Sequence, residues 1–184
     1  VLGHDRGDWS RDVAGSSGSQ ADQTSKGWYL KDDLTLAGGT RLSAGVRTES
    51  IDKRLSDPGS VFRLTDRENA WELGLSQPIS SKTTVWARMG NSFRLANVDE
   101  FSFTNPNVAI RPQTSRDLES GLRWNTGSAR AELRLYRSNL TDEIGYDPNA
   151  VNRFGPTGAN INLDPTRRTG VEAETDWTLQ PGLT

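Results

Sequence analysis

Few residues in this sequence could perform covalent or acid–base chemistry. Of the 184 residues, only His4 is a histidine, and there is no cysteine. No Gly-x-Ser-x-Gly elbow is present, so no nucleophile can be paired with a base by motif. The adjacent Asp32 and Asp33 would point to opposite faces of a strand and could not share a proton. The sequence therefore predicts no catalytic residue, and we expect that the protein is not an enzyme.

A cluster of oxygen-bearing side chains lies late in the chain. Asp142, Glu143 and Asp147 are followed closely by Asn149 and Asn152. Oxygen ligands at such spacing can hold calcium, but the order matches no calcium-loop template. The pattern favours solvated loop carboxylates, and we predict no metal site and no cofactor.

Exposed aromatic side chains are the best candidates for ligand contact. Rings in surface loops can stack on a bound molecule, although they can also pack loop against loop. The predicted ligand-binding residues are Phe101, Phe103, Tyr146 and Phe154.

Charged residues recur on one side of several segments. Burying them in a dry core without partners would be costly, so they need water or opposite charges. The lumen of a barrel that holds a polar plug would supply both, and so would the solvated face of a soluble sheet. The predicted lumen-facing residues are Glu119, Arg123, Glu132, Arg134, Glu172 and Glu174.

These residues must be positioned by antiparallel strands. Polar and apolar side chains alternate on both sides of the Asn125–Gly127 turn, which is typical of a hairpin. In the segment from Val171 to Trp177, one face is apolar and the other carries carboxylates. We expect about eight strands of ~10 residues or more, which is long enough for a tilted strand to cross a bilayer.

Connections of two lengths alternate along the chain. Short periplasmic turns and long extracellular loops are typical of an outer-membrane barrel. The predicted short turns are 37–39, 78–81, 125–128 and 179–183, and the predicted long loops are 15–26, 52–66, 94–111 and 144–160.

The composition excludes some classes of protein. Only 33% of the residues are hydrophobic, and no apolar run approaches the ~18 residues of a membrane helix. Strands need an apolar residue only at every second position, so this average still allows a membrane barrel. The 22 basic and 24 acidic residues are spread along the chain, which gives no support to nucleic-acid binding.

Three blocks resemble the late barrel strands of TonB-dependent outer-membrane receptors: Arg111–Arg123, Asp142–Pro148 and Asn162–Glu172. Three upstream segments, Tyr29–Leu34, Leu42–Arg47 and Ser92–Asn97, resemble the barrel strands that precede these blocks in the same family. The resemblance implies an all-β fold, an antiparallel up-and-down transmembrane β-barrel. Residues 1–184 would be a fragment of that barrel domain with about eight strands, and the plug domain would be absent.

By the same resemblance, the protein would import a scarce nutrient across the outer membrane of a Gram-negative cell. The expected ligand is a ferric siderophore or another iron complex, with haem or cobalamin possible. The implied partners are outer-membrane lipid and the TonB-ExbB-ExbD system, which would act through the plug. The alternatives are a soluble antiparallel β-sandwich that serves in binding or adhesion, and an outer-membrane barrel enzyme that depends on His4.

Overall fold

The structure is a computed structural model of the chain. It describes residues 1–12, 20–57, 60–98, 100, 104–105, 108–152 and 154–178. The predicted ligand contacts Phe101 and Phe103 lie outside these residues, as do positions 179–183 of the last predicted turn.

One large antiparallel sheet dominates the described residues. Its eight strands are β1 (Leu2–Asp12), β2 (Gln20–Thr35), β3 (Arg41–Asp57), β4 (Ser60–Pro78), β5 (Thr83–Arg94), β6 (Gln113–Asn125), β7 (Ala129–Thr141) and β10 (Thr166–Trp177). Two short strands, β8 (Ile144–Asp147) and β9 (Ala159–Asn162), lie in the chain segment that connects β7 to β10. They pair with each other in a separate sheet.

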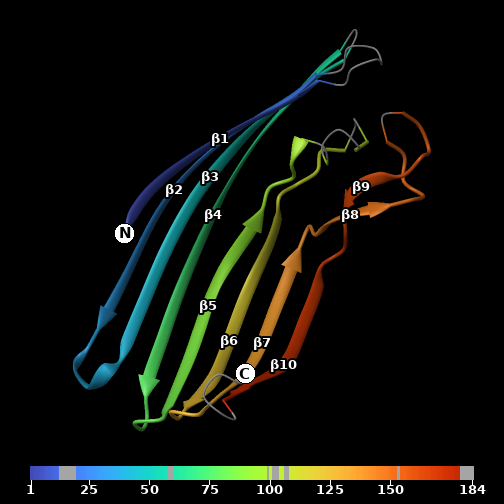
Figure 1. Ribbon diagram of the computed structural model, residues 1–184. Coiled ribbons are helices and arrows are strands. Elements are labelled where there is room, and N and C mark those ends of the chain that lie inside the picture. The colour runs from blue at the N-terminus through green and yellow to red at the C-terminus, as the bar shows by residue number, and fades with distance from the viewer. Residues whose placement is uncertain are drawn as a thin grey trace.

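The strands follow one another as a meander. Each strand from β1 to β7 pairs with the next one in the chain, and β10 pairs with β7, so β1 and β10 lie at the two edges. Figure 1 shows the strands side by side and tilted, with β8 and β9 beyond one end of the sheet. This arrangement confirms the predicted all-β antiparallel fold of about eight strands.

The described short connections gather at one end of the sheet (Figure 1). The 3-10 turn η1 (Ala37–Gly39) joins β2 to β3, and Gly38 and Gly39 both take a φ of 82° there. Residues 79–82 join β4 to β5, and residues 126–128 join β6 to β7. Glycine takes positive φ without steric cost, which explains its place in the first of these turns.

Two of the predicted long loops are wrong. The segment 52–66 is mostly strand, because β3 continues to Asp57 and β4 begins at Ser60. Likewise, much of 15–26 is strand, since β2 begins at Gln20. Charged residues in 52–66 and small polar residues in 15–26 suggested loops, but polar side chains also pair across strands: Thr65 of β4 donates a hydrogen bond to Asp52 of β3 at 2.7 Å. The loop predicted at 94–111 agrees with the gap between β5 and β6, whereas 144–160 contains β8 and part of β9.

The two faces of the sheet differ in chemistry. Register places apolar side chains in rows on one face, such as Leu73 beside Met89 and Leu122 beside Leu133. No second sheet covers this face in the part of the chain that the structure describes, and Leu73 and Leu133 remain 49% and 46% exposed. No described helix is both long and apolar enough to cross a membrane.

Tryptophans stand at both ends of this apolar face. Trp124 and Trp177 lie next to the short connections, whereas Trp28 lies near the middle of β2, where the apolar row of that strand ends before Lys26. All three are exposed on the apolar face, Trp177 most of all at 72%. Tryptophan favours the boundary between an apolar and an aqueous phase, because its ring is apolar and its N–H is polar.

The buried side chains lie at the long-connection end of the sheet instead of between two layers. Ala21, Leu55 and Val98 form one buried cluster, with Phe62 packed against it. A second cluster contains Ala96, Ile110 and Ile144. The segments that follow β5 and β7 therefore pack on the ends of the strands.

We predict that Leu133→Arg destabilises the full-length protein in phospholipid vesicles by about 2–4 kcal/mol, because a cation would face hydrocarbon near the middle of the apolar face. Equilibrium unfolding in denaturant measures the change. The control is Val61→Arg, which places the same charge on an exposed residue far from the apolar rows. Equal unfolding midpoints for wild type and Leu133→Arg would contradict a lipid-facing surface.

Candidate functional site

All six predicted lumen-facing residues lie on the face opposite the apolar rows. Arg123 lies beside Glu132 across β6 and β7, and Glu132 lies beside Glu174 across β7 and β10. Arg134 lies beside Glu172 in the next row. These residues alternate with the apolar ones along each strand, as the period of two requires. We call this surface the charged face.

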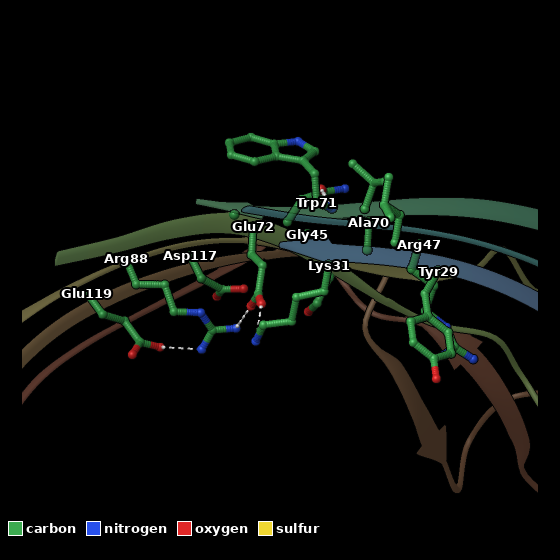
Figure 2. A pocket seen from close by; sticks show the side chains of 15 residues that line it. Tyr29, Lys31, Gly45, Arg47, Ala70, Trp71, Glu72, Arg88, Asp117 and Glu119 are labelled. Atoms are coloured by element: carbon green, nitrogen blue, oxygen red, sulfur yellow. Dashed lines mark hydrogen bonds and ion pairs between the residues drawn. The ribbon is translucent and has the colours of Figure 1, made fainter. Parts of the chain in front are cut away.

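A continuous series of ion pairs crosses the charged face from β2 to β10. We call it the ion-pair ladder. Its charges alternate in sign, and Figure 2 shows the first four members on the same side of the sheet, with Trp71 on the other side. The nitrogen–oxygen distances are Lys31–Glu72 3.3 Å, Glu72–Arg88 3.1 Å, Arg88–Glu119 3.9 Å, Glu119–Arg134 3.0 Å and Arg134–Glu172 3.1 Å.

The first step of the ladder spans a whole strand. Lys31 is on β2 and Glu72 is on β4, with Gly45 of β3 between them in the register. Two strand spacings are about 9.5 Å, which the lysine and glutamate side chains cover together. A Cβ on Gly45 would lie only 3.2 Å from Glu72 Cγ. The missing side chain at Gly45 therefore leaves the space in which this pair forms.

A second pair lies nearer the short connections. Arg123 Nε donates a hydrogen bond to Glu132 at 2.9 Å, and its guanidinium lies 5.1 Å from the centre of the Trp86 ring. The Glu174 side chain makes no hydrogen bond or ion pair with the residues that the structure describes. The charged face thus combines compensated charges with carboxylates, such as that of Glu174, that are open to another partner.

The charged face is neither dry nor fully solvated. The side chain of Glu119 is 16% exposed, whereas those of Arg88 and Arg134 are 55% and 39% exposed. Ion pairs at this exposure contribute little stability because water screens them. They can instead exchange partners with a second polar surface at small cost.

Sequence reasoning missed half of the ladder. It did not identify Lys31, Glu72 or Arg88 as site residues, although Glu72 and Arg88 each lie between apolar neighbours. The signal was in the register, which brings Arg88 directly opposite Glu119. Several pairs are diagonal or cross a glycine, so the sequence pattern of a single strand does not show them.

The predicted aromatic contacts Tyr146 and Phe154 lie in the connection between β7 and β10, and they are 60% and 64% exposed. The Tyr146 hydroxyl donates a hydrogen bond to the Thr157 carbonyl at 2.9 Å, and its ring lies over Gly158. The Phe154 amide donates to Asn152 Oδ1 at 2.7 Å. Both residues therefore belong to the same hydrogen-bonded connection, and both side chains are exposed.

This connection is joined to the one that follows β5. The Arg94 guanidinium pairs with Glu100 at 2.6 Å and donates to the Ile144 carbonyl at 3.3 Å. The Asn162 side chain accepts from the Arg111 amide at 2.8 Å and donates to the Arg111 carbonyl at 2.9 Å. The two long connections therefore form one hydrogen-bonded unit.

A buried lysine fixes the same unit to the strands. The Lys53 side chain is fully buried and donates to Asp66 at 2.7 Å and to the Ala96 carbonyl at 2.9 Å. The Val98 amide donates to Gln23 Oε1 at 3.0 Å. Both contacts tie the segment after β5 to β2, β3 and β4.

The late carboxylates bind arginines instead of one another. Asp142 pairs with Arg111 at 2.5 Å, and Glu143 pairs with Arg168 at 2.5 Å. The hydrogen bond from Arg111 to Asp142, together with the charge of Asp142, raises the pKa of Arg111 above its usual value. Asp147 accepts from the Asn149 amide at 2.8 Å. These contacts agree with loop carboxylates that structure the chain.

Comparisons with known proteins place the chain in a family. Residues 3–184 match the family described as TonB dependent receptor-like, beta-barrel. The vitamin B12 transporter BtuB of Vibrio vulnificus is 28% identical over 172 residues. That match covers 91% of this chain and 26% of the relative, so the chain spans about a quarter of the relative's length.

Solved structures show the same fold. The copper transporter OprC aligns with a TM-score of 0.72 at 18% identity, over 93% of this chain and 30% of that protein. The ferric citrate transporter FecA aligns with a TM-score of 0.67 at 22% identity, over 92% of this chain and 26% of that protein. The alcaligin receptor FauA of Bordetella pertussis aligns with a TM-score of 0.65 at 18% identity, over 89% of this chain and 29% of that protein. On the strength of the family match along nearly its whole length, the chain belongs to the TonB-dependent receptors and forms part of their β-barrel.

Proposed function

We propose that this chain forms part of the wall of an outer-membrane transporter that imports a scarce metal-containing nutrient. The proposed substrate is a ferric siderophore or another iron complex, with haem and cobalamin as further candidates. The names of the similar proteins include ferric citrate, alcaligin and vitamin B12, and the chain covers only part of each.

The observation that carries the proposal is that strands β3 to β7 and β10 have an apolar face and a polar face with ion pairs in their halves nearer the short connections. A wall that separates lipid from a polar interior needs this division. The apolar face would contact outer-membrane lipid, and the charged face, including Glu119, Arg123, Glu132, Arg134, Glu172 and Glu174, would face the lumen. The ion-pair ladder would meet a polar plug, through which the TonB-ExbB-ExbD system would act.

The connections at the long end would contact the nutrient. The rings of Tyr146 and Phe154 are exposed at that end, and Phe101 and Phe103 follow β5 in the sequence. Planar rings on a fixed support bind ligands well, because little conformational freedom is lost on binding.

Growth of a strain that lacks the full-length gene tests the proposal. Ferric siderophores, haem and cobalamin are each supplied as the only source of iron or of the vitamin, with and without functional TonB. We expect growth to fail on one compound and to be restored by the gene only when TonB is present. A gene that is dispensable on every source, or that acts without TonB, would overturn the proposal.

We predict that two neighbouring residues of β10 differ in their access to water. Glu174→Cys should react with a charged, water-soluble maleimide when the full-length receptor is in lipid nanodiscs, whereas Ala173→Cys should not. The chain contains no cysteine that would react in the background, and any outside it are first replaced. Labelling of Ala173→Cys in preference to Glu174→Cys would show that the two faces are assigned the wrong way round.

We predict that Phe154→Ala weakens binding of the nutrient identified by growth by about tenfold, because a stacked ring is lost. Calorimetric titration of the purified receptor measures the affinity. Val151→Ala, at an exposed position in the same connection, is the matched control and should bind as wild type does. Unchanged affinity for Phe154→Ala would remove that ring from the binding site.

A further inference from the structure

Three arginines lie on the apolar face, at the long-connection end of its apolar rows. Arg116 of β6, Arg137 of β7 and Arg167 of β10 are all exposed. Register aligns Arg116 with Asn139 and Asn139 with Arg167, and Arg137 lies opposite Leu118. We call these three residues the arginine belt.

The arginine belt has no counter-ion in the described part of the chain. None of its members makes an ion pair with a described residue, in contrast to Arg88, Arg134 and Arg168 of the charged face. Their nearest polar partner is an amide, since Asn139 Oδ1 accepts from Arg167 at 3.0 Å and from Arg137 at 3.5 Å.

Carboxylates are absent from this face of the surrounding strands. The outward side chains of β5, β6, β7 and β10 are apolar, hydroxyl, amide or arginine in every case. Uncompensated guanidinium groups at the border of an apolar surface attract an anion, and their planar forks match phosphate oxygens.

The border position also defines the rest of the ligand. A groove of about 470 Å³ is lined by the apolar Met89 and Leu118 and by the polar Asn91, Arg116, Arg137 and Asn139. Asp117 also lines it, but its carboxylate accepts hydrogen bonds from Ser115 and Ser138 on the charged face. A molecule that fits it has hydrocarbon next to phosphate. Both parts occur together in a phospholipid or glycolipid whose headgroup carries a net negative charge.

We propose that the arginine belt binds the phosphorylated headgroup of an anionic lipid in the outer leaflet, while the acyl chains of that lipid cover the apolar rows. The proposal rests on the membrane setting of the proposed function. It adds a specific lipid site to the outside of the wall, separate from the nutrient site and from the ion-pair ladder.

The test uses the purified full-length receptor in a nonionic detergent. Diphosphoryl lipid A is titrated against it and binding is followed by native mass spectrometry, with the same lipid stripped of phosphate as the second probe. We expect Arg116→Gln/Arg137→Gln to bind the diphosphoryl lipid about thirtyfold more weakly, since each arginine contributes about a factor of five next to an anionic lipid. Removal of the phosphates should weaken binding to the wild type at least as much.

The matched control is Arg54→Gln/Arg63→Gln. These two arginines lie opposite each other on β3 and β4, on the same side of the sheet as the belt, and both are exposed. Arg63 is eight residues beyond Trp71, about 27 Å along the strand, so it lies far from the apolar rows. This variant should bind as wild type does, and an equal loss in both variants would overturn the belt as the site.

The same experiment separates the lipid site from its membrane setting. The headgroup of phosphatidylcholine has no net charge. Flotation with vesicles of this lipid therefore reports membrane insertion that does not depend on the arginine belt. Wild type and Arg116→Gln/Arg137→Gln should float equally well. Failure of the wild type to float overturns the proposed function, whereas flotation with binding that is indifferent to phosphate or to the belt variant overturns this inference alone.

Discussion

The cost of placing charge in a dry environment governs how this sheet is built. A charged side chain can enter neither hydrocarbon nor a packed interior unless it is paired or hydrated. The strands meet this constraint by directing carboxylates and ammonium or guanidinium groups to one face and pairing them across strands, as Glu72 pairs with both Lys31 and Arg88. The other face is largely apolar in its central rows, although Asp32 of β2 shares a row with Leu73 and Met89. The apolar face and the ion-pair ladder are therefore two results of one constraint.

Glycines on the charged face make room for the long side chains that this arrangement needs. The Trp86 ring lies over Gly121, where an added Cβ would come within 2.7 Å of the ring, and Tyr136 lies over Gly170 in the same way. Gly45 leaves the space in which Lys31 meets Glu72. Glycine weakens an isolated strand because it loses more conformational entropy on folding. Contacts of the side chains that cover these glycines offset that loss, so the glycines and the long residues beside them act together.

The sequence predicts the strands and their faces well because both depend on local alternation. The pattern from Val171 to Trp177 identifies both faces of β10 without any knowledge of its neighbours. The local pattern fails where contacts between residues distant in the sequence determine the structure. Lys53 and Asp66 suggest a solvated loop, yet Lys53 is buried under Ala96 and both residues belong to long strands. The ladder was incompletely identified for a related reason, since diagonal pairs such as Glu119 with Arg134 depend on the register of two strands at once.

The location of the buried residues explains how the long connections that carry the exposed rings are attached to the sheet. A sheet with one apolar face and one wet face has no layer in which to fix its connections, and the described core is accordingly found where those connections cover the strand ends. Lys53 fixes the segment after β5 to β3 and β4, and Arg94 joins that segment to the connection that carries Tyr146. Breaking a buried pair is far more costly than breaking a solvated one, so the Lys53 pair is a firmer attachment than any member of the ladder. The connections that carry the rings are thus attached to the strands by buried contacts, while the charged face keeps solvent-exposed pairs that are individually weak.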